Sequence, residues 1–161
     1  MSETQTHRDI PLKRRTLYFQ NIDQILEEAD RLASGDYQKC ADWSLGQNCH
    51  HLATWMVMCM DGLPHFPMIL RILIRAVFNK DKILQKGFKP GMNVRGKLKK
   101  LEPTSDITDE TGLEALHKAV ERFRHEPKLP AHPLLGKMSD DDWLQLHLRH
   151  AEHHLGMIHP M

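Results

Sequence analysis

The chain has 161 residues, of which 40% are hydrophobic and 27% are charged, a composition typical of one soluble globular domain and not of a disordered protein. Its 22 lysines and arginines nearly balance its 21 aspartates and glutamates, so the net charge is only +1. This balance gives no overall attraction to nucleic acid or to an anionic membrane, and we expect neither as a partner.

The cysteines and the apolar segments indicate the cell compartment. The three cysteines have no CxxC spacing, which argues against a disulfide framework and favours a reducing environment. The first ten residues are polar and contain no apolar signal core. The longest apolar run, residues 66–78, contains two arginines and is shorter than the roughly 20 residues that span a bilayer. We therefore predict a cytoplasmic protein.

Two helices are predicted in the first third of the chain, after residues 1–14, which we expect to be flexible. Apolar residues recur at helical spacing from Thr16 to Ala33. A second helix begins after Ser44, which forms a capping-box pattern with Gln47, and continues to about Met60. One stripe of this helix is apolar and should face the core: Leu45, Cys49, Leu52, Met56 and Cys59.

Next to this stripe the second helix carries polar and aromatic side chains. Asn48, His51, Trp55 and Met58 share one side of the helix at 100° per residue. His50 points elsewhere. We therefore predict that His51 faces inward and that His50 is exposed.

A third helix is predicted from Pro67 to about Gln85, since proline suits the first turn of a helix. Apolar residues nearly encircle it apart from Arg71 and Arg75, so it suits a core position, a pocket mouth or a dimer contact. The two arginines suit a clamp for a substrate carboxylate, although a solvated or interface role is the simpler interpretation. Residues 87–108 are predicted to form a long loop, and such loops are often functional.

The fourth predicted helix covers Asp109 to His125, and the last begins after Ser139 and continues to about Ile158. No segment has a convincing strand pattern. In the last helix one face, within about 60°, carries four ring side chains: Trp143, His147, His150 and His154.

His150 and His154 are spaced i, i+4, which lets two imidazoles reach one metal ion from consecutive turns. The glutamate of the HExxH metalloprotease motif is missing, because Ala151 follows the first histidine. His153 leaves this face and is predicted to be exposed. With His51 as a third ligand, the pattern predicts a metal site with an open coordination position. The alternative is a buried core His51 and an exposed histidine pair.

Other side chains are candidates for the surroundings of this site. Trp55 and Trp143, with Asn48 and Met58, are predicted to line a pocket, although bundle-core aromatics are an equally good interpretation of the tryptophans. His147 lies one turn before His150. It is a candidate hydrogen-bond partner of a metal ligand or a candidate acid/base, and a hydrogen-bonded core histidine is the simpler interpretation.

These motifs resemble those of a known superfamily. The segment Trp43–Gln47 and the following His51–Ala53 resemble the second helix of the DinB/YfiT-like proteins, and Leu146–Leu155 resembles their closing HxxxH helix. The resemblance covers residues 15–158 in motif order and spacing. An uncharacterised branch, domain of unknown function 1569, is similar in further positions: His132–Gly136, Ser139 and Trp143. His153 departs from the pattern, because relatives typically carry an apolar residue there.

The resemblance implies an all-α fold, a DinB-like four-helix bundle with a long crossover connection and an extra short helix or loop insertion, often dimeric. It implies that His51, His150 and His154 bind one divalent ion, commonly nickel, zinc or iron. Characterised relatives include thiol-dependent transferases, so the expected partners are a small-molecule substrate, such as a low-molecular-weight thiol, and a second copy of the chain. A metal-dependent hydrolase, a small-ligand carrier without turnover and a stress-associated dimer with a structural or vestigial metal are the alternatives.

Overall fold

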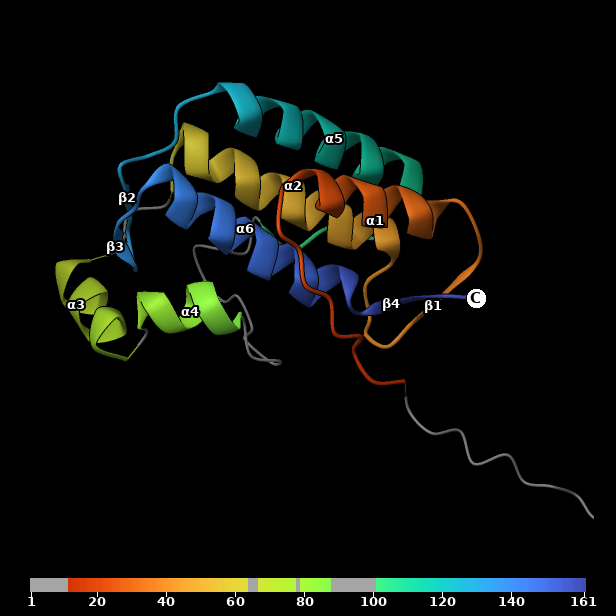
Figure 1. Ribbon diagram of the computed structural model, residues 1–161, viewed down its shortest axis with the longest axis horizontal. Coiled ribbons are helices and arrows are strands. Elements are labelled where there is room, and N and C mark those ends of the chain that lie inside the picture. Colours follow the sequence, from red (N-terminus) through yellow and green to blue (C-terminus); the bar gives the residue numbers. More distant parts are fainter. Residues whose placement is uncertain (1–11, 64–66, 78, 88–100) are drawn as a thin grey trace, which may run out of the picture.

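The computed structural model describes residues 12–63, 67–77, 79–87 and 101–161 and is mostly helical (Figure 1). Helices α1, α2, α5 and α6 pack against one another, α4 packs next to α6, and α3 lies at one end of the molecule beyond α4 (Figure 1). None of the helices in the described ranges is both long and apolar enough to cross a bilayer. The helix bounds are Asp23–Ala33 (α1), Leu45–Asp61 (α2), Met68–Val77 (α3), Lys80–Lys86 (α4), Asp109–His125 (α5) and Asp140–Leu155 (α6).

Three of the helix starts follow from their capping residues. Ser44, Thr108 and Ser139 each accept a hydrogen bond from a backbone N–H three residues later, and each cap forms a full capping box. The predicted bounds of α5 are confirmed, and so is the predicted apolar stripe of α2, all of which is buried.

The prediction that the first helix begins at Thr16 is wrong, because the chain stays irregular until Asp23. The backbone N–H of Arg15 donates to the carbonyl of Gly156, and the backbone N–H of Phe19 donates to the carboxylate of Glu152. These bonds to the C-terminal end of α6 compete with the helical bonds that the periodicity of residues 16–22 predicted. Of the stretch expected to be flexible, residues 1–11 lie outside the described part of the chain.

The predicted third helix is in fact two helices. Asn79 has an extended backbone, with φ −77° and ψ 116°, and its side chain accepts a hydrogen bond from the backbone N–H of Lys82. Asparagine favours this capping position, so α4 starts anew after α3 instead of continuing it.

Short strands correct the expectation that the chain has none. Tyr37–Lys39 (β1) pairs antiparallel with Ile158–Pro160 (β4), and Ala131–His132 (β2) pairs with Gly136–Lys137 (β3). Pieces of two or three residues are too short to show an alternating pattern. Because β4 follows immediately, α6 ends at Leu155 rather than at Ile158.

Helices α2 and α5 approach each other closely at a pair of glycines. A Cβ atom on Gly46 would lie 2.2 Å from the carbonyl oxygen of Thr108, and one on Gly112 would lie 2.0 Å from the carbonyl oxygen of Gly46. Asp109 strengthens the crossing, because its Oδ1 accepts from the backbone N–H of Gly46 at 2.7 Å and its Oδ2 accepts from the hydroxyl of Tyr37 at 2.8 Å. A side chain at either glycine would force the two backbones apart.

We predict that Gly112→Ala lowers the free energy of unfolding by about 3 kcal/mol or more, at the upper end of overpacking costs, because the clash is with backbone that cannot rotate away. Urea denaturation measures this change. Gly35→Ala is the matched control, since nothing lies within 4 Å of a Cβ placed there. Equal stability of the two variants would contradict the close crossing.

Candidate metal centre

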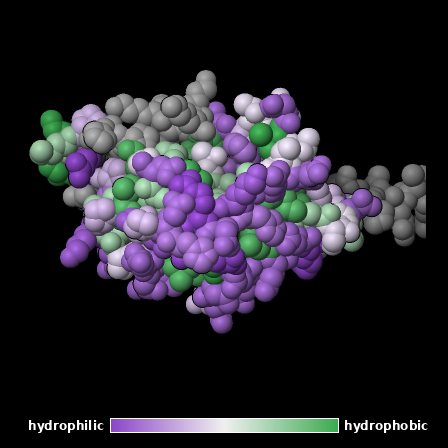
Figure 2. Space-filling model, turned by 90° about the horizontal axis from the view of Figure 1, so that it is seen from above, coloured by the Kyte–Doolittle hydropathy of each residue, from purple (hydrophilic) through white to green (hydrophobic). Residues whose placement is uncertain are grey.

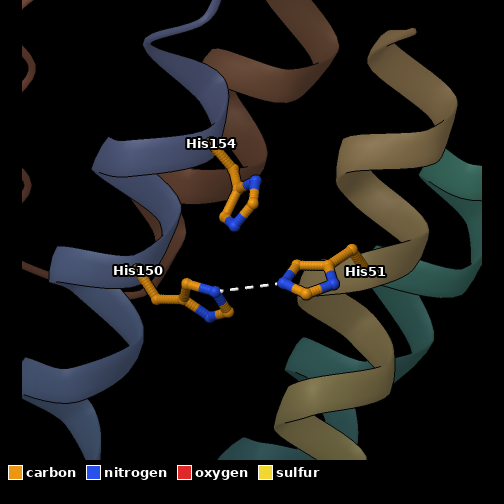
Figure 3. A group of neighbouring side chains, drawn as sticks. All are labelled: His51, His150 and His154. Carbon is orange, nitrogen blue, oxygen red and sulfur yellow. Dashed lines mark hydrogen bonds between the residues drawn. The ribbon is translucent and has the colours of Figure 1, made fainter. Parts of the chain in front are cut away.

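The three histidines predicted to bind a metal ion lie together between α2 and α6. His51 comes from α2, and His150 and His154 come from consecutive turns of α6, with their rings turned toward one another (Figure 3). One ring nitrogen from each lies within 4.8 Å of the others. His51 and His150 are buried, with 3% and 8% of their surface exposed. The arrangement has the composition and spacing of a metal-binding group.

A backbone carbonyl sets the tautomer of His51. Its Nδ1 lies 2.7 Å from the carbonyl oxygen of Leu101, which can only accept a hydrogen bond. The proton of the neutral ring is therefore on Nδ1, and Nε2 presents a lone pair to the other two histidines. Leu101 is itself buried and belongs to the predicted 87–108 loop, of which residues 88–100 lie outside the described part of the chain.

The side-chain amide of Asn48 sets the tautomer of His154. Its nitrogen donates to the carbonyl oxygen of Ser44 at 2.8 Å, which directs its Oδ1 toward His154 Nδ1 at 3.0 Å. Because Oδ1 can only accept, Nδ1 of His154 carries the proton and Nε2 is the free nitrogen. Asn48, predicted as a pocket residue, is buried and contacts the site through this hydrogen bond.

His150 is the third member of the group. Its Nε2 lies 3.2 Å from Nε2 of His51. Two ligands of one tetrahedral ion with bonds of about 2.0–2.1 Å are separated by about 3.3 Å. The separation of these two nitrogens therefore suits a shared ion as well as a shared proton.

Burial keeps these rings neutral. Desolvation lowers the pKa of His150 and of His154 well below the ordinary value for histidine, and it also lowers the pKa of His51. Only the neutral imidazole has a lone pair for a metal ion. In the described part of the chain the group contains no carboxylate or thiolate, so all of its ligands are uncharged.

Two tryptophans contact the histidine group. The ring of Trp43 stacks on His154 with 5.6 Å between centroids and 10° between planes. Trp55, a predicted pocket residue, meets His150 edge-on at 5.7 Å. Trp43 stands in the motif before α2, but the helical pattern did not mark it as part of the site because it precedes the helix.

The other two predicted pocket residues are Trp143 and Met58. Trp143 is fully buried and donates from its indole nitrogen to the carbonyl oxygen of Leu129 at 2.7 Å, an arrangement typical of a core residue. Met58 is half-buried on α2.

His147 lies deeper in the core than the three histidines. Its ring meets Phe123 edge-on and stacks on Trp143, and its Nε2 lies 3.2 Å from the sulfur of Cys59. Burial lowers the pKa of His147 to about 3 and raises that of Cys59 to about 12. At neutral pH both groups are uncharged, which favours a core role for His147 and an unreactive Cys59.

Two histidines predicted to be exposed are half-buried instead. His153 lies beside the N-terminal segment, where its Nδ1 is 2.6 Å from a guanidinium nitrogen of Arg14. His50 is on the other helix, α2. The periodicity could not anticipate an irregular segment that lies along α6.

The two arginines of the third predicted helix were candidates for a substrate clamp. Arg71 donates to the carbonyl oxygen of Pro133, and the side chain of Arg75 lies outside the described part of the structure.

Comparison with known proteins identifies one family. The family described as "Protein of unknown function (DUF1569)" matches residues 12–161. No curated protein and no solved structure matches the chain.

The buried histidines predict an acid-sensitive fold. Below about pH 6.5 the unfolded chain binds a proton at His147 that the folded chain rejects until about pH 3. The free energy of unfolding should therefore fall as the pH drops through this window, by up to about 1.4 kcal/mol per pH unit for each such histidine. We predict that His147→Leu flattens this dependence in urea titrations from pH 7 to pH 4, roughly neutral to mildly acidic. His125→Leu, on the exposed side of α5, is the control. Identical slopes for all three proteins would contradict the prediction.

Proposed function

We propose that this chain, which belongs to the DUF1569 family of proteins of unknown function, binds one divalent transition-metal ion through His51, His150 and His154 and activates a thiol or a water molecule there. One observation carries the proposal. The Nδ1 atoms of His51 and His154 are engaged by Leu101 and Asn48, so their Nε2 lone pairs point into the space that they share with His150. Outer hydrogen bonds of this kind orient the histidine ligands of metal sites.

A core of hydrogen-bonded histidines explains the group less well. One proton between His51 and His150 would satisfy that pair. That proton would not engage the remaining ring nitrogen of His154, which points toward the same space in Figure 3. A metal ion accepts all three lone pairs at once.

The ligand set favours certain metals and a certain chemistry. Imidazole nitrogen suits nickel, zinc and iron, the metals expected from the resemblance to DinB/YfiT-like proteins. An ion held by three neutral ligands keeps its full charge and can lower the pKa of a thiol or water in an open coordination position. The rings of Trp43 and Trp55 pack beside His154 and His150 and would give a bound substrate apolar surroundings.

The arrangement of the helices supports placing the family in the DinB/YfiT-like superfamily. Helices α1, α2, α5 and α6 pack as the four helices of such a bundle would, and the connection from α2 to α5 is long and carries α3 and α4. In such a bundle this connection would be the long crossover, with two short helices inserted in it. A thiol-dependent transferase is the activity that this placement favours, with a hydrolase as the alternative, in a cytoplasmic homodimer.

We predict that protein purified without a histidine tag or chelator contains close to one equivalent of a transition metal. His154→Ala should lose the metal, and Asn48→Ala should weaken its binding roughly 10- to 100-fold, because the hydrogen bond that orients His154 is lost. Elemental analysis and competition with a chromophoric chelator measure the two effects.

The matched control is His153→Ala, which removes a neighbouring imidazole that is not part of the three-histidine group. It should retain the metal. A wild-type protein with no more than traces of any transition metal would refute the metal site, and so would equal metal contents in the His153 and His154 variants.

A cobalt-substituted protein distinguishes the proposed activities. We predict that a low-molecular-weight thiol changes its visible absorption spectrum, because a sulfur ligand in the open coordination position alters the electronic transitions of the ion. The His154→Ala variant should show no such change. A wild-type spectrum that no thiol changes would contradict thiol activation and favour hydrolysis or metal binding without turnover.

A further inference from the structure

The charges of this chain are distributed unevenly. Residues 67–100 contain 10 of the 22 lysines and arginines and only one of the 21 aspartates and glutamates, so this segment carries +9 and the rest of the chain −8. Residues 67–87 alone contain five basic residues and a single acidic residue, Asp81. The overall charge of +1, which argued against an anionic partner, conceals this separation.

Helix α3 exposes large apolar side chains in the same region. Met68, Ile69, Ile72 and Leu73 have 73%, 75%, 60% and 60% of their surface exposed. At 100° per residue they occupy a continuous arc of about 140° with no charged residue inside it. Burial of one such side chain is worth about 1.5–3 kcal/mol, so an exposed row of four is unusual for a surface that contacts only water.

The position of α3 leaves this face accessible. The helix lies at one end of the molecule, away from the packed α1, α2, α5 and α6 (Figure 1). Seen from above, apolar side chains gather at the same end, whereas the centre of this face is hydrophilic (Figure 2). Lys82 and Lys86 are exposed on the adjoining α4.

From this combination we infer that α3 is an interfacial anchor that binds the surface of an anionic lipid bilayer. Its apolar face would enter the boundary between headgroups and acyl chains, and the basic residues of α3 and α4 would attract the lipid phosphates. An apolar face bordered by lysine and arginine is the composition that lies in the plane of a membrane. Ten residues, about 15 Å, are enough for this role, which requires no spanning helix.

A second copy of the chain is a less favourable occupant. A two-fold contact through α3 would bring two positively charged segments together, and like charges across an interface oppose association. An anionic bilayer complements both properties of the surface, its apolar arc and its positive charge.

Sedimentation of the full-length protein with lipid vesicles tests the inference. The protein should bind vesicles of equal parts phosphatidylcholine and phosphatidylglycerol. It should bind vesicles of phosphatidylcholine alone much more weakly. Salt at about 1 M, which shortens the range of charge interactions to about 3 Å, should weaken binding. The double variant Ile72→Ser with Leu73→Ser should lower the partition coefficient at least tenfold, because both exposed side chains lose their apolar contact.

Leu12→Ser with Met161→Ser is the matched control, because it removes two large apolar side chains that are 42% and 73% exposed outside α3. It should bind as the wild type does. Equal binding of the two double variants would overturn the inference, and so would equal binding to both lipid compositions. If the protein binds no vesicles but forms a dimer that the Ile72/Leu73 variant abolishes, α3 is a contact between copies and the membrane inference is wrong.

Discussion

The backbone contact between α2 and α5 is the constraint on which the position of the site depends. With glycine on both sides at residues 46 and 112, the helices approach until their backbones touch, and the carboxylate of Asp109 accepts the N–H of Gly46. These contacts fix the start of α2 in both position and rotation. His51 and Asn48 lie within the next turn and a half, so the rotation of α2 decides that both face α6. Glycine, usually a weak choice inside a helix, is here the residue that permits the packing.

The opposite wall of the site is held by different means. The N-terminal segment runs along the end of α6, where Arg149 donates to the carbonyl oxygen of Phe19 and pairs with Glu152 at 2.8 Å. Both charged side chains lie on the side of α6 away from the histidines, and Arg149 is only 5% exposed. A buried pair of this kind contributes little net stability but penalises any arrangement that separates its members. The segment therefore fixes the orientation of His150 and His154.

Much of this organisation follows from the sequence. Helical phase alone separated His51 from His50, and His150 and His154 from His153, because a residue's side of a helix is set by its spacing. The carbonyl of Leu101 could not be predicted, since a backbone atom in a long loop has no signature in the side-chain pattern. Residues 16–22 were mistaken for helix because their apolar residues have helical spacing, whereas this irregular segment is held against α6 instead. The break at Asn79 could have been anticipated from its capping preference.

The distance along the chain between His51 and His150 has a kinetic consequence. Their Nε2 atoms lie 3.2 Å apart although 99 positions separate the residues in sequence. Closing so large a loop costs chain entropy before any contact is gained, so contacts of this range tend to form late in folding. During synthesis α2 leaves the ribosome well before α6, and Asn48 and His51 must stay in a chain that lacks their partners. The three-histidine group is thus a property of the finished tertiary structure, and an ion can be captured by all three rings only once folding is nearly complete.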